Sequence, residues 1–331
     1  MSTTPLVAGA VTFMLALGLV RALWSEQLAS LVLDVPNDRS LHVRPVPRTG
    51  GVGIMLAVAM VVLLFAGGPR AIVMPALLLA ALFLADDVRG LPVGLRFAAQ
   101  IAAAIWFLAA TGPYGVIVLP LLVIGIAWSI NLYNFMDGSN GLAGGMAVIG
   151  FAAYALAADA AGSADLALLS AIVAGAAAGF LVWNFDPARI FLGDAGSIPL
   201  GFLAATIGVL GWQRGIWPFW FPALVFATFI VDSGLTLAKR LVHRENPLQA
   251  HRSHYYQRLI RMGWSHRRLA LNAYMLMAAT AGSALWLRQS SPVVAGLALM
   301  AWGCALAVVV AKVDASWHAS PQRREALKQK A

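Results

Sequence analysis

The chain has 331 residues, of which 60% are hydrophobic and only 11% charged, and its formal net charge is +9. Soluble domains are about 45–50% apolar and about 25% charged, so the composition excludes a soluble globule, and its hydrophobicity excludes a disordered chain. The sequence therefore indicates an integral membrane protein, whose basic excess must come from topology or from an anionic partner such as nucleic acid.

Hydropathy predicts an all-α polytopic membrane bundle of about 10–11 transmembrane helices. The third and fourth spans are shorter than the roughly 20 residues that cross a bilayer, so we expect them to be buried in the bundle or to extend past their apolar runs. Residues 1–311 are expected to form one integral membrane domain, followed by a basic cytoplasmic tail at 312–331. The predicted spans, in chain order, are 5–23, 50–66, 71–85, 97–111, 116–133, 142–158, 166–183, 198–212, 217–238, 269–287 and 293–311.

The basic residues divide unevenly between the two sides of these spans. Alternating loops place 20 of the 23 Lys and Arg residues on one side and only Arg70, Arg214 and Arg288 on the other. Because cytoplasmic loops carry the excess of basic residues, the N-terminus is predicted to be periplasmic and the C-terminus cytoplasmic. The positive charge then follows from topology, and no nucleic-acid partner is expected.

Acidic residues and histidines gather on the same cytoplasmic side. All six His and most of the Asp residues map to cytoplasmic loops or span ends, although the topology rule does not require this. Polar clusters at one face of a membrane protein indicate a site there, and the alternative is that loops are polar in general. The spacings within five segments favour a site.

The first two segments combine charges with chain breaks. The loop before the second span holds Arg39, His42 and Arg48 among prolines and ends in Gly-Gly, which suits the entrance for a lipid phosphate. Asp86 and Asp87 end a span, where adjacent carboxylates repel each other unless a divalent cation or a bound proton intervenes. A solvated helix end is the alternative for this Asp pair.

Two further segments offer oxygen ligands. Asn131, Asn134 and Asp137 are spaced by three, so they share one face of a helix that Asn140 and two glycines then end. Such oxygens suit Mg²⁺ and polar ligand groups, with an Asn/Gly-rich turn as the alternative. Asp194, within a Gly-Asp-Ala-Gly-Ser run, is typical of a helix N-cap and is equally suited to phosphate or metal binding.

The last segment is the basic loop after the ninth span. His251, His254 and Arg258 suit a phosphate or pyrophosphate site, and the alternative is a surface patch for anionic lipid. Asp232, near the end of the ninth span, is expected to support this loop.

In this order, the five segments resemble those of the polyprenyl-phosphate N-acetylhexosamine-1-phosphate transferase superfamily, glycosyltransferase family 4. The resemblance covers residues 34 to about 268 and includes Leu91, Arg96 and Gln100 after the Asp pair. The last loop looks closer to the branch that initiates O-antigen and common-antigen chains than to the peptidoglycan enzyme. One position departs from the family, because its Asn-rich run usually ends in Asp-Gly-x-Asp-Gly and the second Asp is Asn140 here. The departure weakens any role of that position in metal binding or as a base.

The resemblance implies a reaction and a place for it. An N-acetylamino-sugar 1-phosphate passes from a UDP-sugar to undecaprenyl phosphate with release of UMP, at the start of O-antigen or related cell-envelope polysaccharide synthesis. The enzyme would lie in the bacterial inner membrane with its active site on the cytoplasmic face, and a homodimer is compatible with the family. A multi-pass transporter of an anionic substrate is the alternative, since transporters also hold intramembrane acids.

Residue roles also follow from the resemblance. Mg²⁺, or Mn²⁺ in its place, is expected at Asn134 and Asp194, and the catalytic set is Asp86, Asp87 and Asp194. The Asp pair would deprotonate or position the lipid phosphate, with a covalent intermediate on one of them as the alternative. Substrate binding is assigned to three groups: Asn131, Asn134 and Asp137 for the nucleotide or sugar, His251, His254 and Arg258 for the pyrophosphate or sugar, and Arg39, His42 and Arg48 for the lipid phosphate.

Overall fold

The computed structural model describes residues 2–25, 32–34, 45–65, 69–246 and 251–321. Over these residues the chain forms thirteen helices and one two-stranded sheet, which confirms the all-α prediction. The elements are α1 (Thr3–Leu23), β1 (Leu33–Asp34), β2 (Val46–Pro47), α3 (Gly50–Leu64), α4 (Arg70–Arg89), α5 (Val93–Thr111), α6 (Val118–Phe135), α7 (Leu142–Ala160), α8 (Ala164–Asn184), α9 (Asp194–Gln213), α10 (Phe221–Val225), α11 (Ala227–Val242), α12 (Tyr255–Arg261), α13 (His266–Leu287) and α14 (Pro292–Ala319).

Most of the helices match the predicted spans. In the described part of the chain, nine helices are long and apolar enough to cross a membrane, and α3 is a shorter apolar helix. Each predicted span except the ninth coincides with one helix. α4 and α5 run for 20 and 19 residues, because both extend past their apolar runs. The polytopic membrane bundle is therefore confirmed.

One prediction about the C-terminal third is wrong. The span predicted at 217–238 is broken, because α10 and α11 are separated by Phe226, whose backbone (φ −98°, ψ 17°) leaves the helical region. The ring of Phe226 packs against Phe151 and Tyr154. The residue at the break is therefore apolar, and hydropathy does not detect the break. Beyond the last predicted span, α14 continues to Ala319, and its Asp314 is paired with α11 and α12.

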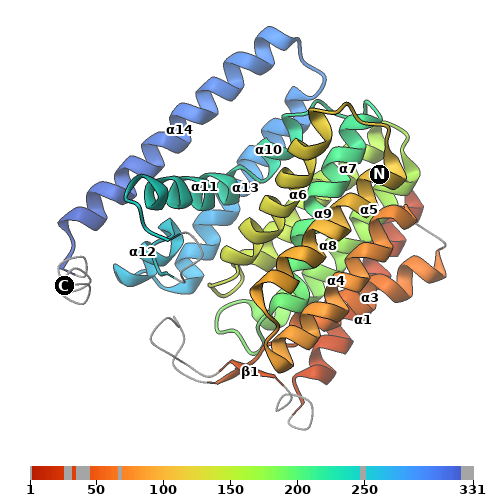
Figure 1. Cartoon of the computed structure of the whole chain (residues 1–331), viewed down its shortest axis with the longest axis horizontal. Coiled ribbons are helices and arrows are strands. Elements are labelled where there is room, and N and C mark those ends of the chain that lie inside the picture. Colours follow the sequence, from red (N-terminus) through yellow and green to blue (C-terminus); the bar gives the residue numbers. More distant parts are fainter. Residues whose placement is uncertain (1, 26–31, 35–44, 66–68, 247–250, 322–331) are drawn as a thin grey trace.

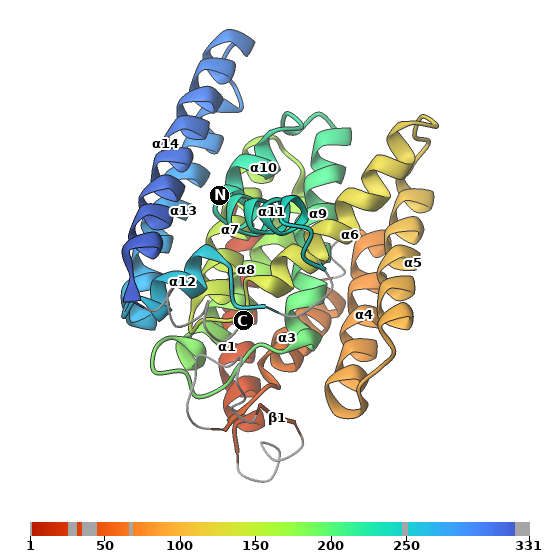
Figure 2. The ribbon, with the colours of Figure 1, turned by 60° about the vertical axis from the view of Figure 1, so that its left-hand side comes forward.

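α9 lies at the centre of the bundle, and most of its residues are buried. It packs against α4 and α6, while α8 packs against α1 and α7. Figure 1 shows α14 running along the edge of the molecule, and most of its length is exposed. Figure 2 places α13 and α14 on one side of the bundle and α4, α5 and α6 on the other.

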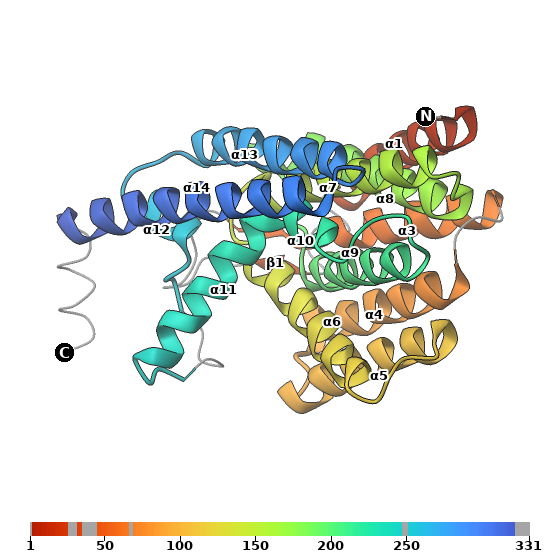
Figure 3. The same cartoon turned by 90° about the horizontal axis from the view of Figure 1, so that it is seen from above.

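α11 leaves the bundle sideways, as Figures 1 and 3 show. Its buried residues include the polar side chains of Asp232, Thr236 and Arg240, whereas Leu235 and Val242 are exposed. A helix that turns polar groups toward the protein and apolar groups outward suits a lipid surrounding. The buried polar side chains of α11 therefore lie between the bundle and the short helix α12.

Candidate active site

The Gly-Gly run of the first loop lies against the start of α9. The N–H groups of Gly50 and Gly51 donate to the carbonyl oxygens of Phe191 (2.9 Å) and Leu192 (2.8 Å). A Cβ on Gly51 would stand 2.3 Å from the backbone nitrogen of Gly196, so only glycine allows this approach. The pairing brings the end of the first loop beside the first turn of α9, although about 140 residues separate the two segments.

Arg48 joins two carboxylates that come from different helices. Its Nη2 lies 3.2 Å from Oδ1 of Asp87, at the end of α4, and 3.6 Å from Oδ1 of Asp194, the first residue of α9. The Asp87 side chain is only 2% exposed, so its charge depends on these partners. The N–H of Ala195 also donates to Oδ2 of Asp87 (3.2 Å), which places that carboxylate at the positive end of α9. Burial opposes the charge of Arg48, but Asp87 and Asp194 outweigh it and raise the pKa of the guanidinium.

Asn134 and Asp137 extend this group from the end of α6. Oγ of Ser197, one turn into α9, donates to Oδ1 of Asn134 (3.0 Å). Asp137 follows the end of α6 and is partly buried, and its burial, with the negative charge of Asp194, raises its pKa well above the usual range. The structure thus brings Arg48, Asp87, Asn134 and Asp194 together, with Asp137 in electrostatic contact with them. We call these five residues the acidic cluster.

Asp86 and Asn131 make their closest contacts elsewhere. Oδ1 of Asp86 accepts the N–H of Leu91 (2.5 Å), and its Oδ2 lies 3.4 Å from Nη1 of Arg96, so Asp86 closes the end of its own helix. Nδ2 of Asn131 donates to Oε1 of Gln100 on α5 (2.6 Å). The predicted pair of adjacent carboxylates is therefore divided between a helix end and the acidic cluster.

Asn140, the departure from the family pattern, has a clear structural partner. Its Nδ2 donates to Oδ1 of Asp186 at 2.9 Å, in the segment that follows α8. An ionised Asp at position 140 has no proton to donate and would repel Asp186. The amide therefore fits the carboxylate that this chain places opposite it, and sequence reasoning did not single out Asp186.

The histidine loop packs against the end of α6. The His254 ring lies 5.8 Å from the Phe135 ring, and the Tyr256 hydroxyl donates to the Phe135 carbonyl oxygen (3.1 Å). The His251 ring stacks on that of His254 at 5.0 Å. Both histidines are thus placed near the residue that follows Asn134.

Arg258 points to the C-terminal helix. Its Nη1 lies 2.8 Å from Oδ1 of Asp314, and its guanidinium is 4.9 Å from the centre of the Tyr255 ring. Asp314 was not predicted as part of any site, because it lies in the stretch assigned to a tail. Arg39 and His42, predicted to meet the lipid phosphate, lie outside the described residues.

The acidic cluster supplies donors of the kind that Mg²⁺ takes. Mg²⁺ is commonly held by one or two carboxylates together with substrate phosphates, and the carboxylate of Asp194, the neighbouring amide oxygen of Asn134 and the carboxylate of Asp87 fit that pattern. Within the described ranges, no group of three or more His, Cys, Asp or Glu side chains is arranged to hold a metal ion. The same cluster offers the Arg48 guanidinium and the positive end of α9 to a phosphate.

Comparisons with known proteins point to one family. The model of glycosyl transferase family 4 matches residues 69–211. The probable undecaprenyl-phosphate N-acetylglucosaminyl 1-phosphate transferase of Bacillus subtilis (strain 168) is 30% identical over 266 residues, 74% of each chain. The decaprenyl-phosphate N-acetylglucosaminephosphotransferase of Mycolicibacterium smegmatis is 32% identical over 289 residues, 72% of this chain and 71% of that protein. The phospho-N-acetylmuramoyl-pentapeptide-transferase of Geobacillus kaustophilus is 35% identical over 198 residues, 59% of this chain and 57% of that protein.

Proposed function

Because the chain belongs to glycosyl transferase family 4, we propose that it transfers a sugar 1-phosphate from a nucleotide sugar to a polyprenyl phosphate. The observation that carries this proposal is the cluster in which Arg48 joins Asp87 and Asp194 at the ends of two membrane helices. A polyprenyl phosphate keeps its hydrocarbon in the bilayer, so its phosphate meets a protein at such helix ends. A water-soluble donor reaches the same level from outside the membrane. Membership of this family favours an enzyme over a transporter.

We assign undecaprenyl phosphate as the acceptor and a UDP-N-acetylamino sugar as the donor. An oxygen of the acceptor phosphate attacks the β-phosphorus of the donor, and a new P–O bond forms. The bond from that phosphorus to the oxygen it shares with the α-phosphorus breaks, and UMP leaves with this oxygen. A phosphate monoester is already nucleophilic near neutral pH, so the protein contributes mainly positioning and charge neutralisation. The names of two relatives, which specify undecaprenyl or decaprenyl phosphate and N-acetylglucosamine, support this assignment.

Different residues of the acidic cluster would neutralise the two anionic substrates. Arg48 holds the acceptor phosphate, and Asp87 positions it or accepts its proton, as its place beside Arg48 at 3.2 Å allows. Asn134 and Asp194 would hold Mg²⁺, or Mn²⁺ in its place, and the bound ion supplies positive charge to the donor phosphates. Asp137 would contact the nucleotide or sugar, and His251 and His254 the diphosphate. Asp86, paired with Leu91 and Arg96, would fix the end of α4 that presents Asp87.

The proposed place of the reaction is the cytoplasmic face of a bacterial inner membrane. The sidedness predicted from the sequence supports this orientation, because 20 of the 23 Lys and Arg residues are assigned to the predicted cytoplasmic side, where Asp87, Asp137 and Asp194 are also assigned. We propose that the product starts an O-antigen or a related cell-envelope polysaccharide.

The direct test is an assay for UMP release. The full chain in lipid nanodiscs is given undecaprenyl phosphate, Mg²⁺ and a panel of UDP-N-acetylamino sugars that includes deoxy sugars. We expect UMP and a lipid-linked sugar diphosphate with at least one donor, and loss of turnover in EDTA with recovery on adding Mg²⁺. Folded protein that releases no UMP with any donor contradicts the transferase assignment, and turnover that persists in EDTA contradicts the metal assignment.

A further inference from the structure

Asp232 is a buried carboxylate on α11 that the proposed reaction does not use. Its side chain is only 9% exposed, yet it accepts the N–H groups of Tyr255 (3.0 Å) and Tyr256 (2.9 Å). Oδ1 also lies 3.0 Å from Nδ1 of His254 and 3.4 Å from the hydroxyl of Thr236. Four donors thus converge on the two oxygens of this buried carboxylate. Its contacts therefore orient the short helix α12 and His254, the residue that precedes it.

The pair with Asp232 decides which nitrogen of His254 carries the proton. An ionised carboxylate only accepts hydrogen bonds, so Nδ1 must be the donor. His254 also stands at the N-cap of α12, where the Gln257 side chain accepts its backbone N–H at 3.2 Å. A histidine held by a carboxylate through one nitrogen and free at the other is the arrangement by which proteins orient an imidazole toward a ligand.

The surroundings of His254 place its ring at the end of α6, the helix that carries Asn134 of the acidic cluster. Its ring lies 5.8 Å from the ring of Phe135, and Phe135 directly follows Asn134 on α6. The rings of His251 (5.0 Å) and Tyr256 (5.9 Å) restrict it further. The ring is therefore fixed in position by packing and by its contact with Asp232.

We propose that Asp232 is a positioning residue for the donor substrate: it holds His254 protonated at Nδ1 and presents Nε2 to the diphosphate of the nucleotide sugar. When His254 carries its second proton, the carboxylate of Asp232 offsets the added charge, and Nε2–H donates to a phosphate oxygen. This role rests on the proposed function, because the diphosphate belongs to the donor of that reaction.

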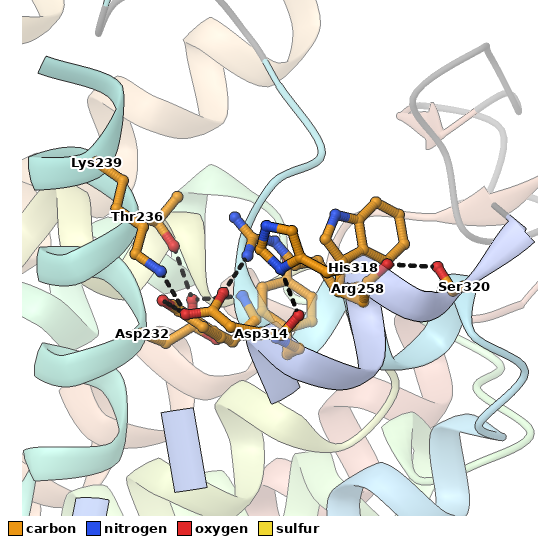
Figure 4. A network of polar contacts seen from close by, with 10 residues as sticks. Asp232, Thr236, Lys239, Arg258, Asp314, His318 and Ser320 are labelled. Atoms are coloured by element: carbon orange, nitrogen blue, oxygen red, sulfur yellow. Dashed lines mark hydrogen bonds and ion pairs between the residues drawn. The ribbon is translucent and has the colours of Figure 1, made fainter. Parts of the chain in front are cut away.

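A second set of contacts holds the same short helix without touching His254. Asp314 of α14 is paired with Lys239 of α11 and Arg258 of α12, and Figure 4 shows these residues close to Asp232 and Thr236. Asp314→Asn therefore loosens α12 and leaves the imidazole–carboxylate pair in place. Thr236→Val removes only the longest contact of Asp232, at 3.4 Å, and keeps a β-branched side chain of similar size.

The first experiment reads the tautomer directly in the resting protein. The full chain is labelled with ¹⁵N-histidine in lipid nanodiscs, and the His254 signals are assigned by their loss in His254→Gln. We expect Nδ1 of His254 to be protonated in the wild type and in Thr236→Val, and this preference to weaken in Asp232→Asn. A neutral His254 protonated at Nε2 in the wild type overturns the proposal, regardless of the result of the UMP-release assay.

The second experiment is a double-mutant cycle on the KM for UDP-N-acetylglucosamine. Asp232→Asn and His254→Gln are each expected to raise this KM at least about 10-fold, the size of losing a hydrogen bond to a charged group. The KM for undecaprenyl phosphate should change much less, and the double variant should be no worse than His254→Gln alone. Asp314→Asn should not show this dependence on His254. Effects of Asp232→Asn and His254→Gln that multiply assign Asp232 to holding α12 only and overturn the proposal. If the wild type turns over no nucleotide sugar, the proposed function fails, and the ¹⁵N spectrum still decides the state of the pair.

Discussion

The contact between Asn140 and Asp186 makes the family departure testable. Asn140→Asp restores the family residue, but it replaces a donor 2.9 Å from a carboxylate oxygen by a second negative charge. We expect this change to destabilise the protein, because the two oxygens repel and the hydrogen bond is lost. Asn140→Ala is the matched control, since it removes the hydrogen bond without adding charge.

The size of the effect follows from the distance. Two unit charges 2.9 Å apart interact by about 1.4 kcal/mol in water and by about 6 kcal/mol at an effective dielectric constant of about 20. Both side chains are partly exposed, so the repulsion lies toward the lower value. The lost hydrogen bond adds about 1 kcal/mol. We therefore expect about 2–4 kcal/mol for Asn140→Asp and about 1 kcal/mol for Asn140→Ala.

The assay is unfolding in detergent micelles, followed by the fluorescence of the 11 Trp residues. Asn140→Asp should unfold at a lower denaturant concentration than Asn140→Ala. Asp186→Asn should restore the stability of Asn140→Asp, because the donor and the acceptor then exchange places. An Asn140→Asp protein as stable as the wild type, or one that Asp186→Asn fails to rescue, would refute the explanation of this departure.

Three further predictions concern the acidic cluster and its support. Asp87→Asn and Asp194→Asn should each lower kcat for UMP release at least about 100-fold, as the loss of a charged contact in a transition state does; a loss below about 10-fold contradicts their place in the cluster. Burial and the charge of Asp194 raise the pKa of Asp137, so its carboxylate destabilises the fold above the unfolded pKa. This penalty shrinks as the pH falls below the folded pKa and is gone below the unfolded pKa. Asp137→Asn should therefore raise the unfolding midpoint at pH 8 and lose this advantage in acid, whereas an equal gain at every pH excludes the titration of Asp137 as its cause. Gly51→Ala should destabilise the protein by about 1–3 kcal/mol and reduce turnover, because its Cβ would stand 2.3 Å from the backbone nitrogen of Gly196; unchanged stability and turnover argue against that close approach.

The sequence alone predicted most of the helices and the segments that bear the site. A membrane helix satisfies its own backbone hydrogen bonds, so a run of apolar residues is enough to predict it. The same local rule fails at Phe226, where the chain breaks without any change in hydropathy. It also does not report that α14 continues past its apolar run to Ala319, where Asp314 contacts α11 and α12.

Only the tertiary structure decided which of the polar residues work together. The sequence presents Asp86 and Asp87 as equivalent neighbours, but Asp86 closes its own helix and Asp87 faces Arg48 and the start of α9. In the sequence Asn140 is only a lost charge, whereas the structure shows that it donates to Asp186. These pairings join residues tens to more than a hundred positions apart, and hydropathy and charge patterns report only on neighbours along the chain. The chemistry of each side chain is therefore readable from the sequence, while its partner is fixed by the packing of α4, α6 and α9 around one another.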